Sequence, residues 1–182
     1  MQYRILSDLD NPCSLRDLLT NRSPERHPKT HRFRLANHLS SSILFVHSGQ
    51  FVHKAIKPEN ILLLTKSWAP PESQLPFVLG LPFLVGFYRC HPISDEFDNR
   101  YVETKLEDCL YQHPSRWGAT AEQAFTIQDD IYSLGVVLLE IGLWQPFVWK
   151  NESRGVFQFS ESFNEVTIME TEQRPRSLNN DY

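Results

Sequence analysis

The sequence predicts an α+β fold that is mostly helical, and three stretches of its 182 residues carry this prediction. Residues 31–48 place aliphatic side chains at spacings of three and four, which is the period of an amphipathic helix. Residues 51–64 contain two short apolar runs around a polar loop, a pattern typical of short strands on either side of a bend. Residues 130–143 are apolar almost all the way round, which indicates a helix surrounded by protein.

The composition fits one globular domain and excludes several classes of function. The chain is 41% hydrophobic and 12% aromatic, and it has a formal net charge of −4 with no long basic run. This balance gives no electrostatic reason to expect binding to nucleic acid or anionic lipid. Cys13, Cys90 and Cys109 are odd in number and lack Cys-x-x-Cys spacing, so the sequence predicts neither a disulfide framework nor a zinc site. We therefore expect a reduced, cytoplasmic protein.

One segment, residues 131–149, resembles a membrane span in its hydropathy. It contains Glu140 and Pro146, and a carboxylate near the centre costs a spanning helix roughly 2.5–3.5 kcal/mol. The first residues contain no apolar core of the length that a signal peptide needs. We therefore expect a buried core helix, with no membrane span.

Sequence signals also mark the helices and loops of the first third of the chain. Residues 14–19 predict a short helix with Ser14 as its N-cap, and residues 21–29 predict a proline-containing surface loop. In the long helix that follows, the expected buried face consists of Leu35, Leu39, Ile43 and Val46. Gly49 is expected to end this helix.

After residue 50 the spacing of the apolar residues becomes shorter, as in strands. Residues 51–53 and 61–64 predict two strands, and the four aliphatics of the second suit burial on both faces. Residues 65–76 are a proline-rich insertion, and residues 77–87 are strand-like but interrupted by glycine and proline. We expect Asp129 or Asp130 to cap the first turn of the apolar helix. The predicted domain covers residues 1–149, and residues 150–182 predict a polar, poorly ordered tail.

Four motifs, in order, resemble those of eukaryotic protein kinases. HKAIKPENILL (residues 53–63) resembles the catalytic loop, and DIYSLGVVLLEI (130–141) resembles the helix through the core of the C-lobe. LVGFYR (84–89) is similar to the strand that leads into Asp-Phe-Gly, and YQHPSR (111–116) stands where Ala-Pro-Glu closes the activation segment. Residues 31–64 and 83–149 resemble most closely the fungal kinase-like domains that occur with prion-inhibition (HeLo) domains. The resemblance implies a kinase-like C-lobe with the N-lobe absent, in a family that uses ATP and Mg²⁺.

At several positions where the sequence departs from the kinase pattern, it lacks the side chains that phosphoryl transfer uses. By this resemblance Ala55 stands at the position of the catalytic base, and a missing base costs about 10²–10⁴ in rate. Gly86 stands at the position of the magnesium-binding aspartate, and the alternative alignment on Gly80 supplies no carboxylate either. No glycine-rich phosphate loop, lysine strand or partner glutamate precedes Ser14, and Ser115 replaces the glutamate of Ala-Pro-Glu.

The retained residues have structural alternatives to their family roles. His53 is expected to be a buried structural residue. Lys57 and Asn60 would contact phosphate and a second Mg²⁺ in an active relative; otherwise Lys57 pairs with an acid or with solvent, and the Asn60 amide satisfies backbone groups. Asp130 either caps its helix or accepts the backbone N–H groups of the His53–Lys54 turn. The histidines lack the spacing of a helical zinc site, so no metal is expected.

The leading functional prediction is a kinase-like domain without catalytic activity (a pseudokinase) that acts through contact with other proteins, in a regulatory or scaffold role. One alternative is a working Ser/Thr kinase that binds ATP and uses another carboxylate; Glu59 is adjacent but is expected to point away. A second alternative is a fragment without independent function, in which the apolar helix would leave an exposed patch.

Overall fold

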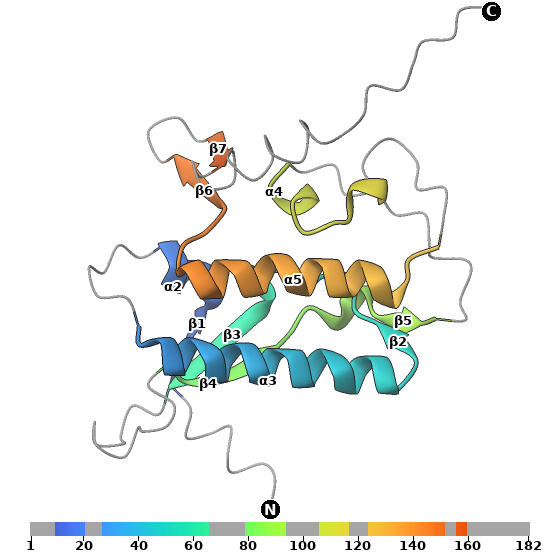
Figure 1. Cartoon of the computed structure of the whole chain (residues 1–182), viewed down its shortest axis with the longest axis horizontal. Helices are drawn as coiled ribbons and strands as arrows, with labels where there is room; N and C mark the ends of the chain where they lie inside the picture. Colours follow the sequence, from blue (N-terminus) through green and yellow to red (C-terminus); the bar gives the residue numbers. More distant parts are fainter. Residues whose placement is uncertain are drawn as a thin grey trace, which may run out of the picture. The chain divides into compact units, whose positions relative to one another are not determined.

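The computed structural model of the chain describes residues 10–20, 27–65, 79–93, 106–116, 124–151 and 156–159 (Figure 1). The chain divides into two compact units, Met1–Gln145 and Pro146–Tyr182. The fold is partly helical and contains small antiparallel sheets. Among the residues just given, no helix combines the length and the apolar character that a membrane crossing requires.

Two long helices, α3 (Lys29–Ser48) and α5 (Ile127–Leu143), lie side by side in the first unit (Figure 1). The buried residues of α3 are Leu35, Leu39, Ile43 and His47. The expectation that Val46 completes this face is wrong, because His47 is buried in its place and Val46 is only half-buried. Gly49 follows the last turn, and its N–H donates to the carbonyl oxygens of Phe45 and Val46, as expected of a residue that ends a helix.

Helix α5 begins at Ile127, three residues earlier than the sequence predicts. Thr126 is its N-cap, and Thr126 and Asp129 bond each other reciprocally in a capping box, an arrangement that satisfies two orphan backbone donors. The cap is therefore neither Asp129 nor Asp130. Asp129 supports the cap from the first turn, and the Asp130 carboxylate bonds elsewhere.

The expectation that α5 is surrounded by protein is wrong for part of its surface. Ile131, Leu139 and Leu143 are 53%, 58% and 44% exposed. The opposite face is buried and contains Val137, Ile141 and the fully buried Glu140. An apolar composition all round the helix therefore did not distinguish the buried face from the exposed one.

Short strands hold the loop between residues 53 and 60. Strands β1 (Asp10–Ser14), β3 (Ile61–Thr65) and β4 (Leu81–Leu84) form an antiparallel sheet in the order β1–β3–β4. Strand β2 (Phe51–Val52) pairs instead with β5 (His91–Pro92). The strands before and after the loop therefore belong to different sheets, and each end of the loop is anchored separately.

Only one face of β3 is fully buried. Ile61 and Leu63 are 0% and 1% exposed, whereas Leu62 and Leu64 are half-buried. The expectation of burial on both faces is wrong, because alternate side chains of a strand point to opposite faces and this small sheet is covered more completely on one of them.

Shorter helical segments also occur among the described residues of the first unit. Ser14 caps α2 (Leu15–Thr20), as the sequence predicts, since its Oγ accepts the Asp17 N–H at 3.1 Å. The remaining segments are η1 (Pro58–Asn60), η3 (Phe87–Arg89), α4 (Leu106–Cys109) and η4 (Pro114–Arg116).

The second unit contains an antiparallel pair of strands, β6 (Val148–Asn151) and β7 (Val156–Phe159). Most of the predicted tail, residues 160–182, lies outside the described residues, as do positions 21–26 of the first predicted loop and 66–76 of the proline-rich insertion. The predicted boundary after residue 149 and the poor order of the tail stay predictions.

Candidate functional site

Asp130 anchors the loop from His53 to Asn60 through hydrogen bonds to its backbone. The Asp130 carboxylate accepts the backbone N–H of His53 at 2.6 Å and that of Lys54 at 2.9 Å. Lys54 has a left-handed backbone with φ of 64°, and this conformation turns the two N–H groups toward one acceptor. Two hydrogen bonds to a buried carboxylate fix the start of the loop against α5.

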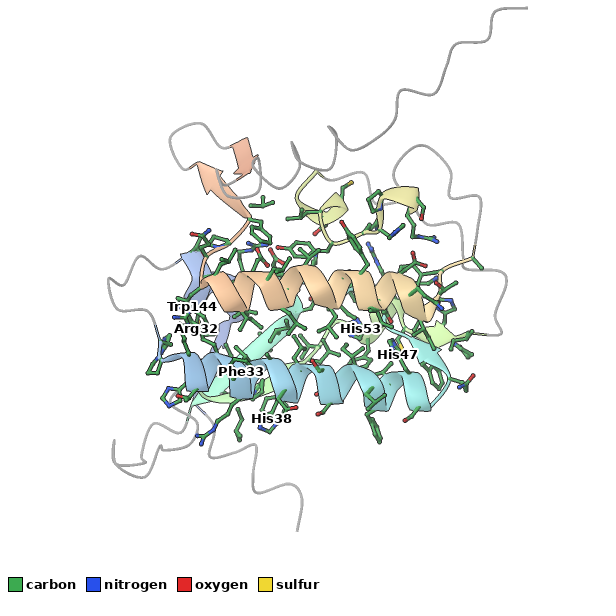
Figure 2. The ribbon with its side chains drawn as sticks, in the orientation of Figure 1. Arg32, Phe33, His38, His47, His53 and Trp144 are labelled. Atoms are coloured by element: carbon green, nitrogen blue, oxygen red, sulfur yellow. The ribbon has the colours of Figure 1, made fainter. Side chains whose placement is uncertain are left out.

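The same carboxylate also reaches α3. His47 Nε2 lies 3.1 Å from Asp130 Oδ2, and Asp130 itself is fully buried. His47 and His53 both lie between the two long helices in Figure 2. Because a buried carboxylate needs compensating donors, these three contacts make Asp130 the shared anchor of α3, α5 and the loop.

His53 is fully buried and structurally engaged. Its Nδ1 accepts the Ala55 N–H at 3.3 Å, and its ring packs edge-on against Phe87 with 4.7 Å between ring centroids. Burial lowers the pKa of His53 below its usual value, although the nearby Asp130 charge acts in the opposite direction. The ring is therefore neutral near pH 7 and supports the turn as an acceptor.

Ala55 presents a methyl group at the position that the resemblance gives to the catalytic base. The residue is buried, and its carbonyl oxygen accepts a hydrogen bond from the Asn60 amide at 2.7 Å. A methyl group cannot take a proton from an alcohol. The Asn60 amide is used within the loop itself.

Gly86 faces that same amide. A Cβ placed on Gly86 would lie 2.7 Å from Asn60 Nδ2, and Gly86 has a φ of 90°. Both facts disfavour any side chain at this position. A side chain on residue 86 would therefore require the end of the Asn60 side chain to shift.

Lys57 forms an ion pair with Asp108 of α4. The two side chains line a pocket in front of Ala55 that has a cavity volume of about 20 Å³. Such a volume accommodates about one water molecule. Lys54 and Arg89 also line this pocket, from the loop and from η3.

A buried polar network on α2, α5 and the loop was missed by the sequence reasoning. Arg16 Nε donates to Glu59 Oε1 at 2.8 Å, and Arg16 Nη2 donates to the Tyr111 hydroxyl at 2.5 Å. That hydroxyl lies 3.0 Å from both carboxylate oxygens of Glu140. A glutamate within an apolar helix was the available signal, because a buried charge requires a partner.

The network raises the pKa values of two of its members, Tyr111 and Arg16. Burial raises the pKa of Tyr111 well above its usual value, and the Glu140 charge adds to this effect. Burial alone would lower the pKa of Arg16, but Tyr111, Glu59 and Glu140 raise it further than burial lowers it. Glu59 is thereby directed toward Arg16.

The remaining predicted positions add no chemistry to the loop. Ser115 is exposed, and its Oγ lies 2.7 Å from His113 Nδ1. Within the described ranges, no group of three or more histidine, cysteine, aspartate or glutamate side chains has a geometry suited to a metal ion.

A loop with the sequence His-Lys-Ala-Ile-Lys-Pro-Glu-Asn, anchored through its first backbone N–H groups by an aspartate near the start of a central helix, is the arrangement that defines a protein-kinase-like site. Comparison with known proteins agrees with this class. The chain is 30% identical over 141 residues to the serine/threonine-protein kinase ATG1 of Kluyveromyces marxianus, a match that covers 71% of this chain and 16% of that kinase.

Two kinases of Schizosaccharomyces pombe are similar as well. The sporulation protein kinase mde3 is 28% identical over 143 residues, covering 78% of this chain and 24% of mde3. The MAP kinase kinase skh1/pek1 is 30% identical over 103 residues, covering 57% of this chain and 23% of skh1/pek1. No family model matches the chain. The chain thus spans less than a quarter of the length of these relatives, and the similarities support a protein-kinase-like superfamily.

Proposed function

We propose that the chain is a catalytically inactive kinase-like C-lobe that acts through contact with other proteins in the cytoplasm. The observation that carries this proposal is the pair Ala55 and Gly86. The first provides no base, and the second provides no metal-binding side chain and adopts a positive φ that favours glycine. Phosphoryl transfer depends on both functions, because the base orients the nucleophile and the metal neutralises charge on the phosphate.

The two polar residues that a nucleotide would meet already have internal partners. Lys57 pairs with Asp108, and the Asn60 amide bonds the Ala55 carbonyl oxygen. In this proposal both are vestiges of a nucleotide site, and the chain uses neither ATP nor Mg²⁺. The kinase names of the relatives do not transfer an activity, because less than a quarter of each relative is matched.

The direct test is phosphotransfer from Mg-ATP to generic protein substrates. We expect no turnover above that of a preparation lacking the chain. Turnover that disappears in both Lys57→Ala and Asn60→Ala would overturn the proposal, because it would depend on the loop. Turnover that survives both substitutions would come from a contaminating kinase. Thermal melts with ATP, with and without Mg²⁺, provide a second readout, and neither is expected to shift the melting temperature.

The exposed apolar residues of α5 favour a second candidate, a fragment without independent function. Ile131, Leu139 and Leu143 are each at least 44% exposed, and contiguous exposed apolar surface marks either an interaction site or an aggregation hazard. A specific partner recovered in pull-downs from the source cells would support the interaction module. Strong ANS binding, loss of near-UV circular dichroism and an empty pull-down would favour the fragment instead.

A further inference from the structure

The two long helices each leave large apolar side chains exposed. On α3, Phe33 and Leu44 are 78% and 69% exposed. They lie eleven residues apart, which is about three turns, so both point to the same side of the helix. On α5, Ile131, Leu139 and Leu143 are exposed as well. We call these five residues the helix-pair face.

Two contacts between the helices show how the exposed rows of side chains align. Arg32 near the start of α3 donates to the carbonyl oxygen of Gly142 near the end of α5 at 2.9 Å. His47 at the end of α3 lies 3.1 Å from the carboxylate of Asp130 near the start of α5. Figure 2 shows Arg32 at one end of the helix pair and His47 at the other. The helices are therefore antiparallel, and these contacts fix their register.

The register gives the helix-pair face the same layout on both helices. Phe33 lies close to the level of Leu143, and Leu44 lies close to the level of Ile131. Each row therefore has one bulky apolar side chain near each end. The midpoint of the row on α3 is level with the midpoint of the row on α5, because the two contacts lie at similar distances on either side of it.

One twofold axis through both midpoints lets the face pack on a second copy of itself. The axis reverses the direction of each helix, so it places Phe33 against Leu44 of the second copy. It also places Ile131 against Leu143 of the second copy. An interface of this kind is isologous, since every contact occurs twice.

The centre of the face is complementary in shape under the same axis. Leu139 and Gly135 lie equally far from the middle of the row on α5, so Leu139 of one copy meets Gly135 of the other. Nothing lies within 4 Å of a Cβ built on Gly135. The bulky central side chain therefore meets open space, and it can pack there without a clash.

Charge and area both favour a second copy as the partner. The residues of α3 between Phe33 and Leu44 on this side are Asn37 and Ser41, and the α5 row also contains no charged residue. An uncharged face pairs with itself without repulsion between like charges. The five apolar side chains expose on the order of 500 Å² in each copy. Two copies would bury about 1,000 Å², which is the size at which specific interfaces begin.

We propose that two copies of this chain form a twofold-symmetric dimer through the helix-pair face. The proposal deepens the proposed function, because it names the protein that the inactive module contacts. An interface of this small size predicts a dissociation constant of about 1–100 µM.

Sedimentation velocity of the full chain, at concentrations on both sides of that range, tests the proposal. The unmodified chain is expected to change from the mass of a monomer to that of a dimer, with no larger species. Phe33→Lys is expected to raise the dissociation constant at least about tenfold, since it places a cation in the apolar interface.

Phe45→Lys is the matched control. Phe45 is 80% exposed on the same helix, but it lies twelve residues after Phe33 and so a third of a turn away from the face. Its dissociation constant is expected to remain within about twofold of that of the unmodified chain. Equal losses in Phe33→Lys and Phe45→Lys would overturn the proposal, because exposed apolar area alone would then explain the association.

A mixture of Leu139→Lys and Gly135→Glu tests the antiparallel register. Each variant alone is expected to dimerise at least about tenfold more weakly than the unmodified chain. In a mixed dimer the new ammonium of one copy meets the new carboxylate of the other, so the mixture is expected to regain about tenfold in affinity. A mixture no tighter than its components would overturn the twofold arrangement.

The unmodified chain decides the matter even if a variant loses its helical circular dichroism. A monomer at every concentration overturns the proposal and leaves the face to another partner. Species that grow beyond the dimer also overturn it, and they favour the fragment without independent function. Phosphotransfer from Mg-ATP is a separate measurement: an inactive monomer would overturn only the dimer, and an active dimer would overturn only the proposed inactivity.

Discussion

The Asp130 carboxylate accepts the His53 backbone N–H at 2.6 Å, and this bond joins residues separated by 77 positions in the sequence. It connects the start of the candidate loop to the first turn of α5. The same carboxylate accepts the Lys54 N–H and lies 3.1 Å from His47 Nε2. Because all three contacts converge on one buried group, the position of the loop depends on Asp130.

Asp130→Ala is expected to lower the free energy of unfolding by about 3–5 kcal/mol, because it leaves two backbone donors without their acceptor in a buried site. Asp130→Asn retains one carbonyl oxygen as an acceptor and is expected to cost about half as much. Urea denaturation followed by circular dichroism measures both. Equal, small losses in the two variants would show that water replaces the carboxylate and that Asp130 is not the anchor.

Gly86→Ala is expected to destabilise the fold by about 2–4 kcal/mol, because the new Cβ would meet Asn60 and the residue would keep a positive φ. Gly86→Asp is expected to cost at least as much, because it adds the same Cβ and keeps the positive φ. Gly135→Ala is the matched control.

Nothing lies within 4 Å of a Cβ built on Gly135 in α5. Alanine there is expected to stabilise the helix by about 0.5–1 kcal/mol. Thermal melts of the three variants give the comparison. A Gly86→Ala variant as stable as the unmodified chain would mean that Asn60 moves aside freely and that position 86 is not closed.

Arg16 contacts one fully buried and one exposed carboxylate, so substitutions at this network compare the stability contributions of a buried and an exposed ion pair. Arg16→Ala removes the cation beside Glu140, which is fully buried, and is expected to cost about 3–5 kcal/mol. Glu59→Gln disrupts only the contact to a carboxylate that is 43% exposed, and it is expected to cost less than about 1 kcal/mol.

Chemical denaturation of both variants, and of Arg16→Ala combined with Glu140→Gln, measures these terms. The double variant is expected to regain part of the loss, since the unpaired buried charge is gone. If it is no more stable than Arg16→Ala, the loss arises from packing of the arginine stem and not from its charge.

The buried His53 predicts a pH dependence of stability. Burial lowers its pKa in the folded state, so the unfolded chain binds a proton more readily. This contribution to stability is fully present above the unfolded histidine pKa of about 6.5 and is lost as the pH falls from there through the lower pKa of the folded state. The pKa of His27 is also lowered, mainly by burial, and contributes with the same sign.

The measurement is the free energy of unfolding between pH 7.5 and pH 5 for the unmodified chain and for His53→Gln. The variant is expected to lose less stability on acidification, whatever its stability at pH 7.5. His38→Gln, which removes an exposed histidine of α3 instead, serves as the control. An unchanged slope in His53→Gln would show that the ring is protonated in both states at the same pH.

The amino-acid sequence alone predicts the order of the main elements and the residue types available for chemistry. Its period of three and four placed Leu35, Leu39 and Ile43 on one face, because a helix allows no other common face for that spacing. The loop motif and the residues Ala55 and Gly86 could be read directly from the sequence, since the residue type at a position shows whether it carries a carboxylate.

Which side chains contact each other became clear only from the packing of the folded chain. Local patterns contain no distances between segments, so the sequence could not select Asp108 as the partner of Lys57 or join Arg16 to Glu140 and Tyr111. It also failed on α5, where an apolar composition all round the helix could not reveal that Ile131 and Leu139 are exposed. Burial and pairing are properties of packing between elements distant in sequence, and each is decided only when those elements come together.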